Sequence, residues 1–428
     1  MAKPWKVLVF PGGTEIGLEI NSALRDCKEI ELYSAGMDTS SHAPFVFIHH
    51  DIVPEVTDHT WLAELNRVIR TRSIDFVIPA HDDAMLALAR DRKNIEAHVL
   101  CSPLETCEIA RSKTATYRHL EGSVAVPTLY QELGQIRAYP VFVKPDRGQG
   151  SQGARPVVSR EELDLAIRGD AGLIVSEFLP GEEYTVDCFS DRDRGLLFCS
   201  GRRRDRIRTG ISVSTRRVEN SQFRQMAEHI SQRMVFHGAW FFQLKRAANG
   251  DLKLLEVAPR IAGAMALHRV IGVNFALLTI FEALRMPFEV VSNQLDVRLD
   301  RAFLNRYAVN LNLNNIYLDL DDTLLVHGQV NLALIRLVFQ CINKNVRVVL
   351  ITRHAGDLGG ILQKHRLQGL FDRIVHLQAG EPKSAAIDDT DGAVLIDDSF
   401  KERLEVHMAT GILTFDNSMI EALQDYRA

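Results

Sequence analysis

The chain has 428 residues, with 50 Lys and Arg against 55 Asp and Glu and a formal net charge of −5. Its 46% hydrophobic and 25% charged residues are typical of a globular chain with a sizeable core, which excludes collagen-like, disordered and disulfide-scaffold proteins. The acidic balance argues against nucleic-acid binding by bulk charge, and no apolar run is long enough to span a membrane.

The length predicts about three domains. Six scattered cysteines without a CxxC pair favour reduced thiols in a cytoplasmic protein. Residues 1–110 alternate short apolar strands with amphipathic helices, and this alternation predicts a Rossmann-like α/β domain with a parallel sheet. The expected strands are 6–10, 30–33 and 75–79, and the expected helices are 17–24 and 62–70.

Two loops at strand ends of this first domain suggest a binding cleft. The loop 11–17 contains tight-turn glycines that lead into a helix, but it lacks the GxGxxG spacing. We therefore expect an anion at the helix N-terminus rather than NAD. His81, Asp82 and Asp83 follow another strand and are expected to face the same cleft, with no assigned role.

Residues 111–308 are predicted to form an α+β domain, because β-rich stretches alternate there with charged turns and amphipathic helices. Lys144 ends one of these strands, just before the Gly-rich segment 148–153. A glycine loop exposes backbone N–H groups that can wrap triphosphate oxygens, and a lysine adds a point charge. No GK[ST] follows, so the segment is not a P-loop, and a flexible surface hairpin is the alternative interpretation.

Further motifs follow in an order that is more informative than any one of them. They lie at Lys113, at 177–183 around a Pro-Gly turn, at 241–244 and at 254–260. Together they resemble the ATP-grasp enzymes, in particular the carbamoyl-phosphate-synthetase-like and amino-acid-ligase branch, over about residues 5–306. The resemblance implies an enzyme that phosphorylates a carboxylate with ATP, after which an amine attacks the acyl phosphate.

The resemblance also implies roles for single positions. ATP is expected at phosphate-, adenine- and ribose-binding residues, which are Lys113, Lys144, Gly150, Ser151, Glu177, Leu179 and Glu183. Gln243 and Glu256 are the implied Mg²⁺ ligands, and Arg260 is expected to face the transferred phosphate. The family commonly has Asn two residues after the metal glutamate, where this chain has Ala258, so one ligand of a second Mg²⁺ is missing.

An arginine cluster is the last feature of this domain. Five arginines lie at positions 202–208 and two more at 216 and 217. A solvated strand face is one interpretation, and as a nucleic-acid patch the cluster lacks interleaved aromatic residues. The other interpretation is that one or two of these arginines hold an anionic substrate or the acyl phosphate. His268 is expected either to line the same cavity or to be packed in the core.

The βα alternation restarts after a polar stretch, which predicts a third domain over residues 313–428. Its strand ends and one helix start carry a set of polar residues: Asp319, Asp321, Thr352, Lys383, Asp397 and Asp398. Carboxylates just past a buried strand are costly unless they bind a cation or do chemistry, and open α/β sheets bind ligands at these strand ends. Taken alone, Asp319 and Asp321 also fit a loop of solvated acids.

In order and context this set resembles the haloacid-dehalogenase superfamily of phosphatases and phosphotransferases, over about residues 314–428. The resemblance implies that Asp319 is the nucleophile that forms an aspartyl-phosphate and that Asp321 is the general acid/base. Thr352 and Lys383 are the implied contacts of the phosphoryl oxygens.

Mg²⁺ is expected at the same strand ends, and its implied ligands are Asp319, Asp321 and one of Asp397 and Asp398. Which aspartate of the last pair binds it is left open. The intervals 324–351 and 353–382 leave no room for a separate cap domain, so we expect a capless phosphatase.

The sequence therefore predicts a multidomain enzyme of α/β and α+β class with two activities, a carboxylate–amine ligase and a phosphatase, and with ATP and Mg²⁺ as cofactors. The expected partners are a small carboxylate, an amine and a phosphorylated small molecule, with no nucleic acid and no membrane, and a homo-oligomer is compatible with the sequence. Three alternatives stay open: a phosphatase whose ATP-grasp half only binds nucleotide or ligand, an ATP-grasp kinase paired with a phosphatase, and a binding protein with two inactive sites.

Overall fold

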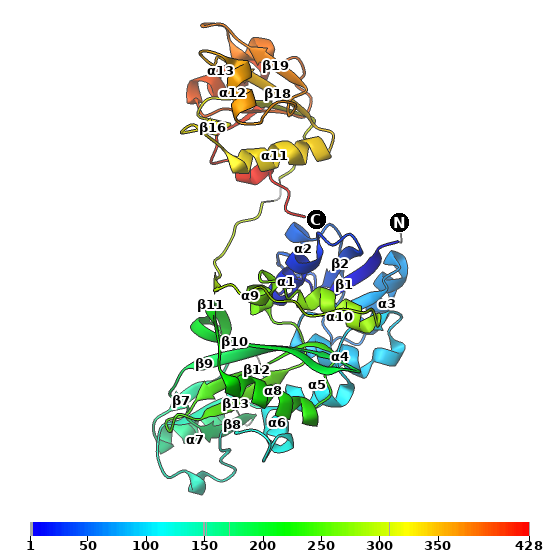
Figure 1. The fold of residues 1–428 in the computed structure, drawn as a ribbon, viewed down its shortest axis with the longest axis vertical. Coiled ribbons are helices and arrows are strands. Elements are labelled where there is room, and N and C mark those ends of the chain that lie inside the picture. The colour runs from blue at the N-terminus through cyan, green and yellow to red at the C-terminus, as the bar shows by residue number, and fades with distance from the viewer. Residues whose placement is uncertain (1–2, 149, 151, 171, 308, 428) are drawn as a thin grey trace. The chain divides into compact units, whose positions relative to one another are not determined.

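The computed structural model describes residues 3–148, 150, 152–170, 172–307 and 309–427 (Figure 1). The chain forms two compact units, which divide between Phe303 and Leu304. Ser151, which we expected to bind nucleotide, lies outside the described residues. No helix in the described ranges is long and apolar enough to cross a membrane. The six cysteines are all free thiols, as predicted.

The first unit begins with a five-stranded parallel sheet in the order β3-β2-β1-β4-β5. Its strands are β1 (Trp5–Phe10), β2 (Ile30–Gly36), β3 (His50–Ile52), β4 (Phe76–Pro79) and β5 (His98–Val99). Its helices are α1 (Glu15–Leu24), α2 (Ala43–Val46), α3 (Trp61–Arg72) and α4 (Asp82–Arg90). Val7 and Val9 of β1 pack into one apolar cluster and Leu8 and Phe10 into another. Both faces of this strand are therefore buried, as is usual in parallel sheets.

Helix α1 starts two residues earlier than the sequence predicted, at Glu15 rather than Gly17. The reason is Thr14, whose extended backbone and side-chain oxygen cap the helix by accepting a hydrogen bond from the Gly17 N–H. The cap also fixes the loop that precedes the helix, because the Thr14 hydroxyl donates to the Ala80 carbonyl at 2.9 Å, just past the end of β4. Two strand ends of the sheet are thus joined.

Two antiparallel sheets follow. The smaller, in the order β7-β6-β8, has strands β6 (Val141–Pro145), β7 (Arg155–Val157) and β8 (Leu173–Glu177). The larger, in the order β13-β12-β9-β10-β11-β14, has strands β9 (Glu183–Asp191), β10 (Gly195–Arg208), β11 (Ile211–Val218), β12 (Gly238–Arg246), β13 (Leu252–Ala258) and β14 (Arg298–Asp300). The helices among them are α5 (Leu104–Arg111), α6 (Lys113–His119), α7 (Arg160–Gly169), α8 (Ser221–Arg233), α9 (Ala266–Arg269) and α10 (Phe275–Ala283).

One apolar core joins the parallel sheet to the larger antiparallel sheet. Ile20 of α1, Phe241 of β12 and Phe275 of α10 belong to it, and each is almost fully buried. This shared core explains why the first 303 residues form one unit although they contain sheets of different types.

The second unit is a five-stranded parallel sheet in the order β19-β18-β15-β20-β21. Its strands are β15 (Asn315–Leu318), β18 (Arg347–Thr352), β19 (Arg373–His376), β20 (Ala393–Ile396) and β21 (Leu413–Phe415), and its helices are α11 (Leu332–Asn343), α12 (Leu358–Lys364) and α13 (Phe400–Thr410). The two-stranded hairpin of β16 (Leu325–Val326) and β17 (Gln329–Val330) follows β15. Later strands add to opposite sides of β15, so its carboxyl end is a switch point of the kind where such sheets bind ligands.

Candidate functional sites

Most residues that we expected to bind ATP line one cavity of the first unit, here called the nucleotide cavity. Both antiparallel sheets contribute to it, and the expected residues among its walls are Lys113, Lys144, Gly150, Glu177, Leu179, Glu183, Gln243 and Glu256. Six of them come from strands β6, β8, β9, β12 and β13 and from the start of α6, and Gly150 and Leu179 lie in the loops after β6 and β8. The structure therefore brings together side chains that are up to 143 residues apart in the sequence, from Lys113 to Glu256 (256 − 113 = 143).

Lys144 is the most deeply buried cation of the nucleotide cavity, with 6% of its surface exposed. Its Nζ donates a hydrogen bond to the Tyr117 hydroxyl at 2.8 Å. Burial lowers the pKa of the Lys144 ammonium to about 8, and the charge of nearby Lys113 acts in the same direction. A phosphate that binds here would stabilise the charged form of Lys144, because its oxygens replace the water that the buried ammonium has lost.

Arg204 of β10, one of the clustered arginines, also lines the nucleotide cavity, although sequence analysis did not place it at the nucleotide. Its guanidinium donates to the carboxylate of Glu183 and, at 2.7 Å, to the side-chain oxygen of Gln243. Its other terminal nitrogen donates to the Gly210 carbonyl. Gln243 faces Glu256 across the β12–β13 register. A fixed positive charge therefore stands beside two of the residues that the sequence assigned to ribose and metal binding.

The far end of the nucleotide cavity holds the residues expected at the adenine. The carboxylate of Glu177 accepts from Lys253 at 2.5 Å and from the Thr128 N–H at 3.2 Å, which fixes the end of β8. Leu179, two residues on, is 4% exposed and adds an apolar surface of the kind that a base ring packs against.

A second cavity, of about 560 Å³, adjoins the first. Residues that line both include Lys113, Arg204, Gln243 and Glu256, so the two cavities share part of their walls. Ala258 lies in the wall of the second cavity, where the family commonly has its Asn.

Arg260, expected at the transferred phosphate, lines this second cavity. Its guanidinium forms a two-pronged ion pair with Asp82 at the start of α4, with N–O distances of 2.7 and 2.8 Å. Burial opposes the charge of Arg260, but the Asp82 carboxylate outweighs it and raises the pKa of the guanidinium. Asp83 holds Arg111 in a similar way, at 2.6 Å. Asp82 and Asp83, to which the sequence assigned no role, thus orient two arginines toward the second cavity.

The arginine cluster of β10 divides between a solvated and a buried role. Arg203 and Arg206 form partly exposed ion pairs, with Glu182 and Asp300 respectively. Arg202 is buried and the side chain of Arg204 is 5% exposed, and both residues line the second cavity. His268 packs between aromatic rings and its Nε2 lies 3.2 Å from a carboxylate oxygen of buried Asp187, so the core interpretation of this histidine holds.

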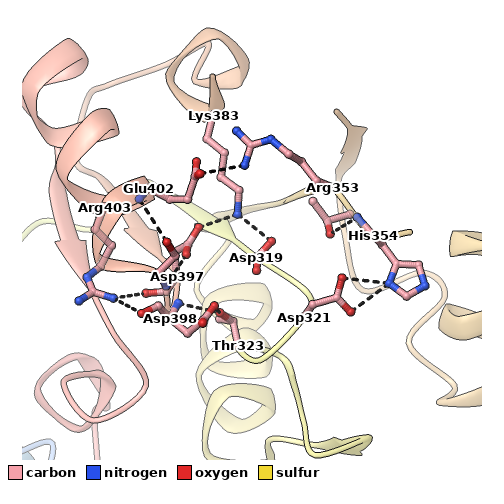
Figure 2. Close-up of polar contacts among 12 residues, drawn as sticks. Asp319, Asp321, Thr323, Arg353, His354, Lys383, Asp397, Asp398, Glu402 and Arg403 are labelled. Carbon is pink, nitrogen blue, oxygen red and sulfur yellow. Dashed lines mark hydrogen bonds and ion pairs between the residues drawn. The ribbon is translucent and has the colours of Figure 1, made fainter. Parts of the chain in front are cut away.

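In the second unit, Lys383 bridges two carboxylates at neighbouring strand ends (Figure 2). Its Nζ lies 2.7 Å from Oδ1 of Asp319, just past β15, and 2.6 Å from Oδ2 of Asp397, just past β20. All three side chains are at least nine-tenths buried. Burial raises the pKa of the Asp319 carboxyl to about 6, although Lys383 pulls it down. Burying a cation with two acids costs desolvation free energy, and clusters of this kind gather at functional sites.

One oxygen each from Asp319, Asp397 and Asp398 lies within 4.8 Å of the others, close enough to share a cation. Thr323 fixes the third of these, since its hydroxyl donates to the Asp398 carboxylate at 3.1 Å and accepts from the Asp398 N–H at 2.9 Å. Carboxylate oxygens are the ligands that Mg²⁺ prefers, so this donor set fits the ion. Both aspartates of the pair that the sequence left open belong to the group.

Asp321 lies outside this group of three and faces another side chain. Both of its carboxylate oxygens contact Nδ1 of His354, at 2.9 and 3.0 Å (Figure 2). Thr352 is fully buried, and its hydroxyl accepts from the N–H of His354 at 3.1 Å. Arg353, between them, pairs with Glu402 at 3.0 Å. The loop after β18 therefore carries an imidazole that sequence reasoning missed, and its place two residues after the predicted Thr352 was the available signal.

Comparison with known proteins identifies the fold of the first unit. Residues 170–302 match the family model described as ATP-grasp in the biosynthetic pathway with Ter operon. The chain is 33% identical over 104 residues to a D-alanine–D-alanine ligase of Marinomonas sp. (strain MWYL1), a match that covers 21% of this chain and 32% of the ligase. The chain thus spans about a third of the length of the curated relative it matches.

Solved structures agree with this assignment. An L-amino acid ligase from Bacillus licheniformis is 17% identical with a TM-score of 0.53, covering 68% of this chain and 76% of its own. A second similar structure is the biotin carboxylase domain of the Hydrogenobacter thermophilus 2-oxoglutarate carboxylase, solved with MgADP and bicarbonate. It is 13% identical with a TM-score of 0.56, and the match covers 69% of this chain and 72% of that chain. At these identities the likeness shows the fold alone. The chain contains an ATP-grasp domain, as the sequence predicted.

Proposed function

We propose that the chain is a bifunctional enzyme, in which an ATP-dependent carboxylate–amine ligase is joined to a Mg²⁺-dependent phosphatase. The proposal divides the chain into a pre-ATP-grasp domain over 1–110, the ATP-grasp domain over 111–308 and a capless haloacid-dehalogenase-like domain over 313–428. Two similar proteins are by name a D-alanine–D-alanine ligase and an L-amino acid ligase, which favours amino acids as substrates.

The ligase half acts by positioning ATP and its substrates for phosphate transfer. Lys113 and Lys144 bind phosphate oxygens of ATP. Arg260, held by Asp82, contacts the oxygens of the phosphate that is transferred. The substrate carboxylate attacks the γ-phosphorus of ATP, and ADP leaves, which gives an acyl phosphate. The amine then attacks the acyl carbon, and inorganic phosphate leaves. Gln243 and Glu256, adjacent on neighbouring strands, are the oxygen donors that would hold Mg²⁺, which neutralises phosphate charge when bound. Positioning and charge stabilisation are the usual sources of rate in such a transfer.

The second cavity beside the nucleotide cavity carries the ligase proposal. A protein that only binds nucleotide has no need of an adjoining space of about 560 Å³ that is lined by oriented arginines. Ala258 favours the rival, a phosphatase whose ATP-grasp half only binds a nucleotide, because it supplies no metal ligand.

The test of the ligase half is ADP release with pairs of amino acids, with mass spectrometry of the product. Dependence of ADP release on both an acid and an amine supports the ligase. A stable phosphorylated product that forms without any amine indicates a kinase. No ADP release with any pair, from protein that still binds MgADP, supports the binding-only rival.

In the phosphatase half, Asp319 attacks phosphorus and becomes an aspartyl-phosphate. Asp321 gives a proton to the leaving oxygen and later takes one from the water that hydrolyses the intermediate. Thr352 and Lys383 hold phosphoryl oxygens, and Asp319, Asp397 and Asp398 would hold Mg²⁺, which neutralises those oxygens. The position of Lys383 between Asp319 and Asp397 carries this proposal. A panel of phosphomonoesters, assayed for phosphate release with and without Mg²⁺, tests it: no hydrolysis of any ester overturns the assignment.

A further inference from the structure

The second cavity holds more cations than its described acids neutralise. Arg111 and Arg260 each have an aspartate partner, as described above. Lys113 and Arg204 also line the nucleotide cavity, where a triphosphate would meet them. Two further arginines of the wall, Arg202 and Arg301, have no part in the ligase scheme given so far.

Arg202 is 3% exposed and only partly satisfied. Its Nε donates to the Asp187 carboxylate at 2.7 Å and its Nη2 does so at 3.4 Å. Its Nη1 is buried in the wall of the cavity and has no hydrogen-bond partner among the described residues. A buried charged donor without a hydrogen-bond partner costs free energy in the free protein. An anion that accepts a hydrogen bond from this donor removes that cost.

Arg301 follows β14 and is anchored by its backbone, whose N–H donates to the Val213 carbonyl at 2.7 Å. Among the described residues its guanidinium has no carboxylate within 4.0 Å, although Glu15, Glu19 and Arg202 are near enough to act on it. Glu19 is already paired with Arg269 at 2.7 Å. A Cβ at Gly263 would lie 3.0 Å from Nη2 of Arg301, so the glycine leaves room for this side chain beside the cavity.

We propose that Arg202 and Arg301 form an anion subsite of the ligase, which binds a carboxylate other than the one that is phosphorylated. The inference rests on the proposed ligase function and narrows its substrates: at least one of them carries an additional carboxylate. That group comes either from a dicarboxylic acid substrate or from an amino acid that serves as the amine. Arg202 contributes the buried donor, and Arg301 contributes a guanidinium with no carboxylate partner among the described residues.

Calorimetry on the full-length protein saturated with MgADP tests the subsite with two pairs of probes. The affinity for succinate, compared with that for butyrate, reports whether an additional carboxylate on the acid is bound. The affinity for alanine, compared with that for ethylamine, reports the same for the amine. The variant is Arg301→Met, which removes the charge without leaving a buried acid unpaired. The control is Arg298→Met on the preceding strand β14, because Arg298 is exposed and does not line the cavity.

We expect wild-type protein and the control to bind succinate at least about tenfold more tightly than butyrate, or alanine at least about tenfold more tightly than ethylamine, and Arg301→Met to lose that preference. Arg301→Lys should recover part of it. If Arg301→Met loses the preference for succinate, the subsite binds the acid. If it loses the preference for alanine, the subsite binds the amine. If neither preference depends on Arg301, or if both methionine variants lose it equally, the subsite is refuted. Unchanged MgADP affinity shows that the variant is folded, and ADP release, measured separately, tells a failed subsite from a failed ligase.

Discussion

The guanidinium of Arg260 and the carboxylate of Asp82 form a two-pronged ion pair across 178 positions of sequence. Arg260 follows the last long strand of the ATP-grasp sheet, and Asp82 begins a helix of the leading parallel-sheet domain. The leading domain therefore does more than cover the cavity, because it sets the direction of the arginine that we assign to the transferred phosphate.

Asp82→Asn tests this relationship. The amide leaves Arg260 without a paired charge, so we expect the arginine to lose its orientation and ATP turnover to fall by about a hundredfold, the usual penalty of a small misplacement in a positioned site. MgADP affinity should change little. Asp83→Asn is the matched control, since Asp83 holds Arg111 rather than Arg260. Equal losses in both variants would contradict a specific role for Asp82.

Nucleotide affinity should depend on pH through Lys144. The buried ammonium has a pKa of about 8 in the free protein, so it is charged below pH 8 and neutral above it. Phosphate binding favours the charged form, and we expect MgADP affinity to fall by up to about tenfold per pH unit above 8. Lys144→Met should bind more weakly at pH 7 and lose this dependence. Calorimetry from pH 7 to 9.5 measures both; an unchanged slope in the variant would contradict the assignment.

The missing metal ligand is testable by restoring it. Ala258→Asn places an amide oxygen two residues after Glu256, where the family commonly has it, and we expect tighter Mn²⁺ binding to the ADP complex. Electron paramagnetic resonance counts the bound Mn²⁺ directly. Ala258→Leu, of similar volume but without an oxygen, is the control, and equal Mn²⁺ binding by both variants would show that position 258 does not face the metal.

His354 should matter for the second half of the proposed phosphatase reaction. Its Nδ1 contacts both oxygens of Asp321, so we expect it to orient this carboxylate toward the attacking water. His354→Ala should slow hydrolysis of the aspartyl-phosphate by about ten- to a hundredfold and make the intermediate accumulate, since general acid–base catalysis contributes about 10²–10⁴. Rapid-quench measurement of labelled protein detects it. His365→Ala is the control; if the two variants behave alike, His354 has no such role.

The sequence predicted the parts of both sites that short motifs encode. Lys144 before its glycine loop and Asp319 after its buried strand are local patterns, and the structure places the first in the nucleotide cavity and the second beside Lys383. Arg204 was one of several arginines in a row, and only the pleat and bulges of β10 decide which of them face inward. Asp82 gained its role from a partner 178 residues away. Spacing along a chain does not report contacts of this kind.

The central claim is that one chain holds two separable active sites. The measurement that tests it most directly is the pairing of ATP-dependent ADP release with phosphomonoester hydrolysis in Asp319→Asn and Glu256→Gln, with Asp322→Asn as a control on the same loop. We predict that Asp319→Asn abolishes hydrolysis and keeps ADP release, that Glu256→Gln does the reverse, and that Asp322→Asn keeps both. Loss of both activities in either of the first two variants, with the protein still folded, would contradict the account.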